Sequence, residues 1–306
     1  SFREDKISFS SLVMGKYLPL LLMPFSFLVV SLHDVFKNNY SIKSLNVCLH
    51  GSNVSPGIYP ETLASLYRPG MTIADLSDAV ISFTDCHMQG ISDIRVLQDR
   101  NYILDSSYLV ICNGEWNRQL LSTTPHRRLE GIDLAVYPRV MIGDDGSVRI
   151  TNSHLESLGI SGAEMLAAAA ANSKKDFVVM PVNEMMGRMT GTAPETMPPI
   201  NMAVVTNKSN YGRAAAMADP DMLEAARRLV GSESVYIIPS SVHEVLVLPA
   251  GSIPSEDLET MIRDINAEIV SLDERLGDHP YLYDGAQLQI ADSHDQKKQL
   301  PAGKNR

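Results

Sequence analysis

The chain has 306 residues, of which 44% are apolar and 20% charged, so it can fold around a core of its own without disulfides. Its net charge of -10 argues against a nucleic-acid binder and against attachment to anionic membranes, because both depend on a surplus of Lys and Arg. Cys48, Cys86 and Cys112 are odd in number and widely spaced, which is typical neither of a disulfide framework nor of a zinc site and favours a reducing cytoplasm.

The segment Leu18 to Val30 is nearly all apolar and is similar to the hydrophobic region of a signal peptide. It is too short to span a bilayer, and Pro19 and Pro24 would interrupt a helix. The sequence therefore favours a buried strand or core segment, with a targeting segment as the alternative. We expect no membrane anchor.

The N-terminal third predicts a hairpin followed by two helices. Strands over 25–36 and 42–49 flank an Asn38-Asn39 turn, since Asn tolerates turn geometry. Pro60 begins a short helix, and Thr72 caps an amphipathic one. Residues 101–112 fit either extended chain or a helix that continues toward Leu121, and the pattern leaves both open.

The middle of the chain carries turn and cap signals. Strands over 132–142 and 147–151 flank Gly143-Asp144-Asp145-Gly146, a hairpin turn. Ser153 with Glu156 and Ser161 with Glu164 predict two capping boxes, the second ahead of an Ala-rich helix. Residues 187–199 are rich in Pro, Gly and Thr and predict a mobile loop.

The last third predicts alternating strands and helices. A strand over 200–205 precedes a helix that Asp219 starts and Gly231 ends, and strands over 235–238 and 242–248 then flank a Pro-Ser turn, with Val245 and Val247 buried. A helix over 255–269 follows, and its apolar residues lie on one face: Leu258, Met261, Ile262, Ile265 and Ile269.

Strands grouped in hairpins among separate helices predict an α+β fold, with a mixed, largely antiparallel sheet and helices packed on it. We expect an N-terminal α+β lobe over 1–112, a C-terminal α+β lobe over 113–290 and a disordered tail over 291–306.

The pair Ser240-Ser241 near His243 invites comparison with a nucleophile and its base. Side chains alternate along a strand, so Ser241 and His243 would share a face while Glu244 would point to the other. There is no Gly-x-Ser-x-Gly elbow. A pair of turn serines beside a hydrogen-bonded His is the favoured interpretation.

Asn207, Lys208 and Ser209 follow an apolar run and could present backbone amides and an ammonium group to an anion. They lack the P-loop spacing, so a hairpin loop is favoured. His243-Glu244 lacks the second His of a zinc helix. We therefore predict no metal and no cofactor.

If a functional site exists, we expect it where the loop 207–212 approaches the turn 239–243, with Asp133 or Arg139 as neighbours, because polar clusters at the ends of apolar strands are where loops carry function.

Several segments resemble a bacterial family known only as a domain of unknown function, number fifty-six eighty-eight of that series, found in anaerobic Gram-positive bacteria. The resemblance covers nearly the whole chain. Its carriers are Val35-Phe36-Lys37-Asn38-Asn39, Gly51-Ser52-Asn53-Val54-Ser55-Pro56-Gly57-Ile58-Tyr59, Pro125-His126-Arg127-Arg128, Asp133-Leu134-Ala135-Val136-Tyr137, Thr206-Asn207-Lys208-Ser209 with Gly212, and Pro239-Ser240-Ser241-Val242-His243-Glu244-Val245. The resemblance implies no activity.

The sequence thus leaves the biochemical function unknown. The first hypothesis is a cytoplasmic binding or accessory module whose partner is an unidentified small molecule or protein. The alternative is a hydrolase that uses His243 with Ser241 or with a remote carboxylate such as Asp133.

Overall fold

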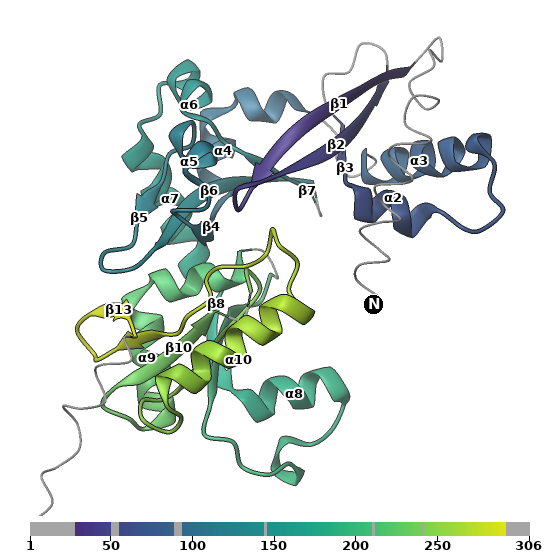
Figure 1. Cartoon of the computed structure of the whole chain (residues 1–306). Coiled ribbons are helices and arrows are strands. Elements are labelled where there is room, and N and C mark those ends of the chain that lie inside the picture. The colour runs from purple at the N-terminus through teal and green to yellow at the C-terminus, as the bar shows by residue number, and fades with distance from the viewer. Residues whose placement is uncertain are drawn as a thin grey trace, which may run out of the picture. The chain divides into compact units, whose positions relative to one another are not determined.

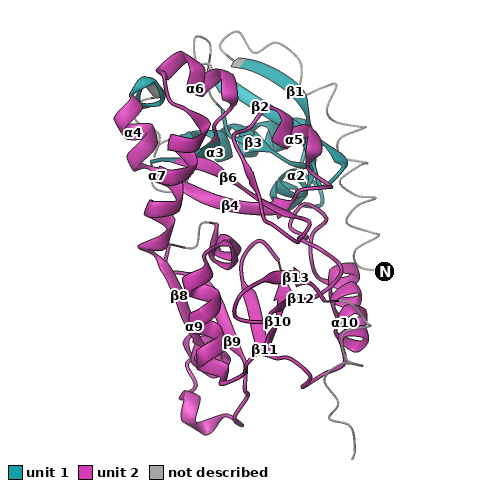
Figure 2. Cartoon of the chain, turned by 90° about the vertical axis from the view of Figure 1, so that its left-hand side faces the viewer, with its two compact units in different colours: residues 1–99, 141–148 teal, residues 100–140, 149–306 magenta. Residues whose placement is uncertain are grey.

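The computed structural model describes residues 28–49, 55–88, 94–143, 146–209, 212–239 and 241–291. Contacts divide the chain into two compact units, coloured separately in Figure 2: residues 1–99 with 141–148, and residues 100–140 with 149–306. The boundary expected at Cys112 falls inside a strand of the second unit. Most of the segment Leu18 to Val30, and the expected tail from position 292 onward, lie outside the described residues.

The fold is α+β with largely antiparallel sheets, which confirms the predicted class. Figure 1 labels the elements. In the first unit they are β1 (Leu28–Lys37), β2 (Tyr40–Leu49), β3 (Gly57–Ile58), α2 (Pro60–Leu66), α3 (Ile73–Met88) and the 3-10 turn η1 (Ile94–Gln98). Among the described residues, no helix is both long enough and apolar enough to cross a membrane.

The first unit is built on the predicted hairpin. Strands β1 and β2 pair in antiparallel register from Lys37 opposite Tyr40 to Leu28 opposite Leu49. Asn38 and Asn39 both have positive φ, 47° and 63°, as a tight two-residue hairpin turn requires. Helices α2 and α3 bury their apolar residues against this hairpin, and Thr72 caps α3 by accepting a 3.2 Å hydrogen bond from the amide of Asp75.

The second unit holds two sheets. Its elements are α4 (Arg100–Asp105), β4 (Ser107–Asn113), α5 (Arg118–Ser122), β5 (Arg127–Arg128), β6 (Leu134–Ile142), α6 (Asn152–Leu158), α7 (Gly162–Lys174), β8 (Phe177–Pro181), α8 (Val182–Thr190), η2 (Pro194–Thr196), β9 (Ala203–Asn207), η3 (Arg213–Ala218), α9 (Pro220–Val230), β10 (Val235–Pro239), β11 (Val245–Pro249), α10 (Ser255–Glu268), β12 (Tyr281–Tyr283) and β13 (Leu288–Ile290). Strand β7 (Gly146–Arg149) pairs with β6 and forms the predicted hairpin, whose residues 141–148 are grouped with the first unit.

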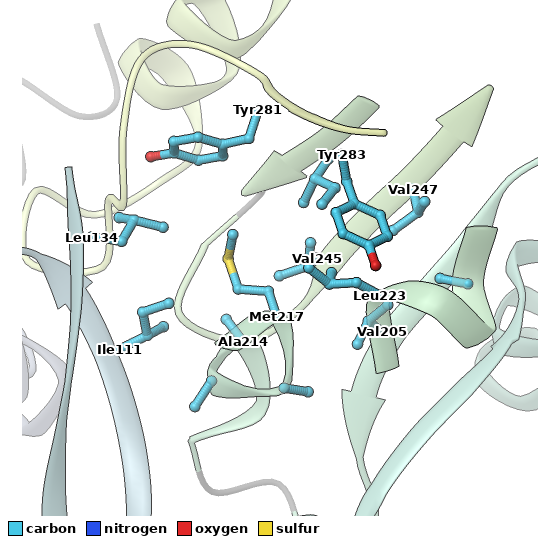
Figure 3. Packing of buried hydrophobic residues seen from close by; sticks show 14 of the residues in the cluster. Ile111, Leu134, Val205, Ala214, Met217, Leu223, Val245, Val247, Tyr281 and Tyr283 are labelled. Carbon is cyan, nitrogen blue, oxygen red and sulfur yellow. The ribbon is translucent and has the colours of Figure 1, made fainter. Parts of the chain in front are cut away.

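The larger sheet of the second unit has the order β13-β12-β10-β11-β9-β8, and each neighbouring pair is antiparallel. One face carries the main apolar cluster, part of which is labelled in Figure 3. Val245 and Val247 are fully buried there, as predicted, although β11 begins at Val245 and not at position 242. The smaller sheet, β4-β6-β5, contributes Ile111, Leu134 and Val136 to the same cluster.

Four local predictions need correction or refinement. Residues 101–112 are neither all strand nor all helix, because α4 ends at Asp105 and β4 begins at Ser107. Thr151, not Ser153, caps α6 by accepting a 3.3 Å hydrogen bond from the amide of His154. Much of the expected loop 187–199 is occupied by α8 and η2, and β9 begins at Ala203.

The stretch after β9 is not a hairpin loop, because the chain continues into the 3-10 turn η3 and not into a strand. Gly212 enters η3 with φ of 60°, and a Cβ atom there would lie 2.1 Å from the carbonyl oxygen of Leu109. The glycine is needed for both its backbone conformation and this close approach.

The apolar face predicted for α10 is only half buried. Leu258 and Ile262 are 1% and 4% exposed, and Leu258 packs with residues of β10, β11 and β12 in a second apolar cluster. Met261, Ile265 and Ile269, each one turn apart, are 50%, 40% and 72% exposed. We call these three residues the α10 stripe. Periodicity therefore identified the apolar face correctly but overestimated how much of it the fold covers.

Candidate functional site

The predicted site residues of β9 and β11 lie at one end of the larger sheet. Val205 of β9 faces Val245 of β11, and two residues farther along the two chains are Asn207 and His243. The backbone amides of Lys208 and Ser209 donate to the carbonyl and carboxylate oxygens of Asp176, at 3.1 and 2.9 Å. These amides are therefore used to fasten the loop to the start of β8.

Ser241 and His243 do not form the contact that a nucleophile and base would need. The Ser241 hydroxyl oxygen accepts a 3.1 Å hydrogen bond from the backbone amide of His243. The His243 imidazole instead lies with Nε2 3.1 Å from Oε1 of Glu274, and both side chains are exposed. Ser240 lies outside the described residues.

The two predicted loops are neighbours, since the amide of Ala214 donates to the carbonyl of Val242 at 3.2 Å. This contact joins the start of η3 to the turn before β11. The contacts do not define a cleft shared by Lys208 and His243, so the composite site stays a prediction.

Asp133 lies at the centre of a polar cluster in the second unit. Its Oδ2 accepts a 2.7 Å hydrogen bond from Nδ2 of Asn113 and lies 3.3 Å from Nε2 of His279. Its Oδ1 accepts a 2.7 Å hydrogen bond from the Tyr281 hydroxyl. Asn113 also donates to the carbonyl of Leu276 at 3.0 Å. We call these four residues, Asn113, Asp133, His279 and Tyr281, the Asp133 network.

Local structure explains how the network forms. Asn113 ends β4, Asp133 immediately precedes β6, and Tyr281 begins β12, so the smaller and larger sheets meet here. Gly114 donates its amide to the backbone carbonyl of Asp133, which fixes the neighbouring chain ends. Figure 3 shows Tyr281 above Leu134, with other side chains of the apolar cluster, such as Met217 and Val245, to the lower right.

Electrostatics favours the ion pair inside this network. Burial by itself would raise the pKa of Asp133, but hydrogen bonds from His279, Tyr281 and Asn113 outweigh it and hold that pKa below its usual range. Burial would likewise lower the pKa of His279, yet the hydrogen bond and charge of Asp133 raise it. Burial and the adjacent carboxylate also raise the pKa of Tyr281 well above its ordinary value.

The Asp133 network is arranged for support more than for proton transfer. Both carboxylate oxygens of Asp133 already accept hydrogen bonds. One imidazole nitrogen of His279 faces Asp133, and the other, Nδ1, is buried and has no hydrogen-bond partner among the residues that the structure describes. A general base needs a nitrogen within reach of its substrate, and neither nitrogen of His279 meets that requirement.

Arg139 does not join this network. It lies six residues after Asp133 along an extended strand, which separates their backbones by about 20 Å at ~3.3 Å per residue. Its neighbour is Tyr137, whose pKa is raised by burial and by the Cys112 thiol, with Arg139 opposing the rise. Burial raises the pKa of Cys112 to about 12, so this thiol is not an activated nucleophile.

The loop between α10 and β12 supplies residues that the sequence did not identify. Glu274 faces His243, and its backbone carbonyl accepts from the amide of Val242. His279 faces Asp133 five residues later. No local sequence motif indicates either contact. For the Asp133 network the sequence offers one signal, which is that the apolar strand β4 ends in a polar residue, Asn113. Among the described residues, no three His, Cys, Asp or Glu side chains gather closely enough to hold a metal ion.

These features define an α+β protein whose polar residues at the sheet ends are largely engaged with one another. A model of DUF5688, a family of unknown function, matches residues 21–285, so the chain belongs to this family. No curated protein and no solved structure matches the chain significantly.

Proposed function

We propose that this protein is a bacterial, cytoplasmic binding or accessory module that acts by docking a protein partner on α10. The observation that carries the proposal is the α10 stripe. Three large apolar side chains, two on α10 and one on the residue that ends it, follow one another at four-residue spacing, continue the buried face of that helix and remain exposed. Single exposed apolar residues are ordinary, whereas an aligned group beside polar residues is typical of an interaction surface.

The state of the polar residues supports binding over hydrolysis. The Ser241 oxygen accepts from a backbone amide, the Asp133 oxygens are occupied, and one nitrogen of His279 is buried. A hydrolase needs a nucleophile or an activated water within hydrogen-bond reach of its base.

Photo-crosslinking in cells that express the native gene tests the proposal. A benzophenone amino acid at position 265 should give adducts of higher mass. The same probe at Thr260, an exposed position on the opposite side of α10, should not. Equal adducts from both positions, or none from position 265, would contradict a docking role.

A hydrolase remains the second candidate because His243 has a carboxylate partner, Glu274, in place of the remote Asp133. That pair could orient an imidazole as the acid of a triad does. Purified protein should then cleave chromogenic esters or peptides, and both His243→Ala and Glu274→Gln should lower the rate. A rate equal to that of buffer, or a rate that His243→Ala leaves unchanged, excludes this candidate.

A further inference from the structure

The α10 stripe has an acidic border. At about 100° per residue around a helix, Asp257, Asp264 and Glu268 lie beside Met261 on the side away from the buried residues. All three carboxylates are exposed. An ion pair joins Arg263 to Glu259 elsewhere on the surface of α10.

The opposite border of the α10 stripe is closed by the protein itself. Asn266 is buried and donates to the carbonyl of Gly277 at 2.9 Å and to the carboxylate of Asp278 at 2.8 Å. The accessible surface therefore consists of an apolar row with three exposed carboxylates along one side. On the other side Asp278 is engaged by Asn266, and the guanidinium of Arg275 donates to the backbone carbonyl of Asn266.

From this asymmetry we infer that α10 binds a cationic amphipathic helix of a partner protein. The inference rests on the proposed docking function and adds the chemistry of the partner. Apolar side chains at i, i+4 and i+8 fit an apolar helix face laid alongside, because residues at this spacing share a face. Lys or Arg along one edge of that helix would meet Asp257, Asp264 and Glu268, whose mutual repulsion the pairing relieves.

The shape of the surface supports a helix over a single inserted side chain. Met261 and Ile269 are eight residues apart, which spans about 12 Å along the helix axis. Leu272, 36% exposed, lies just beyond the helix end. A partner helix of two to three turns is long enough to contact the whole row.

Synthetic peptides test the charge and the apolar face separately. The probe is a labelled helix-forming peptide of about five turns, with Leu on one face and Lys beside it. One control peptide replaces Lys by Glu, and another replaces Leu by Ser. Fluorescence anisotropy with the full-length protein should show the Leu/Lys peptide binding at least about tenfold more tightly than either control, a difference of about 1.4 kcal/mol.

Protein variants locate the binding surface. Ile265→Ser with Ile269→Ser should weaken binding of the Leu/Lys peptide about tenfold or more at any salt concentration. Asp264→Asn with Glu268→Gln should weaken it about two- to tenfold at low salt, and the effect should disappear at about 1 M salt, because exposed charges are screened.

Matched controls exclude general stickiness. Leu229→Ser removes an apolar side chain that is 46% exposed on a different helix, α9. Glu256→Gln removes a carboxylate on the far side of α10. Neither change should alter peptide affinity.

Equal binding of the Leu/Lys and Leu/Glu peptides would overturn the charge assignment and leave the docking function standing. Adducts at position 265 without peptide binding would do the same. Absence of both peptide binding and adducts would overturn both proposals. Crosslinks from position 265 that reach only other residues of the same molecule would also overturn both. A sole adduct to a second copy of this chain would overturn the cationic helix, since that copy carries the same acidic surface.

Discussion

Replacing Asp133 by Asn tests whether the Asp133 network stabilises the second unit. The substitution keeps the size of the side chain and removes its charge. Three donors, from Asn113, His279 and Tyr281, now converge on two carboxylate oxygens. An amide has one acceptor oxygen, and its NH2 group would face a donor, so at least one donor loses its partner.

The expected cost follows from these contacts. A hydrogen bond to a charged group contributes about 1.5–3 kcal/mol, and an unmet buried donor costs about 1–3 kcal/mol. Asn113 keeps its bond to the carbonyl of Leu276, and a change of tautomer could let His279 accept from the new amide. We therefore expect Asp133→Asn to lower the free energy of unfolding by about 2–4 kcal/mol near pH 6.

The same variant should change how stability depends on pH. The depressed pKa of Asp133 stabilises the fold above the unfolded value near 3.9, and that contribution is lost as pH falls through the folded pKa. The raised pKa of His279 stabilises the fold below the unfolded value near 6.5 and is lost as pH rises through the folded pKa. Both contributions are present from about pH 4 to about pH 6.5. In the wild-type protein stability should decline above that window as His279 loses its proton. Asp133→Asn should remove this decline, because without the carboxylate burial would lower the pKa of His279.

The assay is urea denaturation at several pH values, followed by fluorescence. The chain has a single tryptophan, Trp116, whose amide donates to Asn113 at 3.1 Å, so the signal reports on the second unit beside the network. Asp264→Asn, an exposed carboxylate on α10, is the control for lost negative charge. If Asp133→Asn changes the free energy of unfolding by less than about 0.5 kcal/mol, as surface substitutions do, the network does not stabilise the fold.

Three further predictions use the same kind of measurement. Gly212→Ala should cost about 2 kcal/mol or more, because its Cβ atom would overlap the carbonyl of Leu109 and φ is positive, and a smaller cost would show that the loop adjusts freely. Asn39→Val should destabilise the first unit by about 1 kcal/mol, while Asn39→Gly should stay within about 0.5 kcal/mol; circular dichroism follows both, and equal costs would contradict the turn assignment. Ile262→Ser should cost about 3 kcal/mol or more and Ile265→Ser less than about 0.5 kcal/mol, and comparable costs would mean that the α10 stripe serves the fold itself.

Elements defined by local chemistry could be predicted closely from the sequence. The Asp219 carboxylate accepts a hydrogen bond from the amide of Asp221 at the start of α9, and Gly231 ends that helix with φ of 67°, as expected. Asn38-Asn39 likewise forms the turn between β1 and β2. Such signals act over a few residues, so a single sequence contains all the information needed to recognise them.

Contacts between distant parts of the chain could not be predicted in this way. Tyr281 and Asp133 are 148 positions apart, and Glu274 meets His243 across 31 positions. Which polar residue receives which partner depends on the order of strands in the sheets, and no short motif encodes that order. The sequence therefore identified Asp133 and His243 as candidates but not the residues that engage them.

The α10 stripe illustrates the intermediate case, in which a local pattern is correct and its consequence is not. A period of 3.6 residues identifies the side of a helix that is apolar, but the burial of that side depends on what lies opposite. In α10 the fold buries Leu258 and Ile262 and leaves Ile265 exposed, together with Ile269 directly after the helix. An apolar row that the fold leaves uncovered favours association, and Asp264 and Glu268 beside it would repel acidic partners. Apolar attraction with charge selection is the combination that a specific docking surface requires, which is why the charge of the bound helix is the decisive measurement.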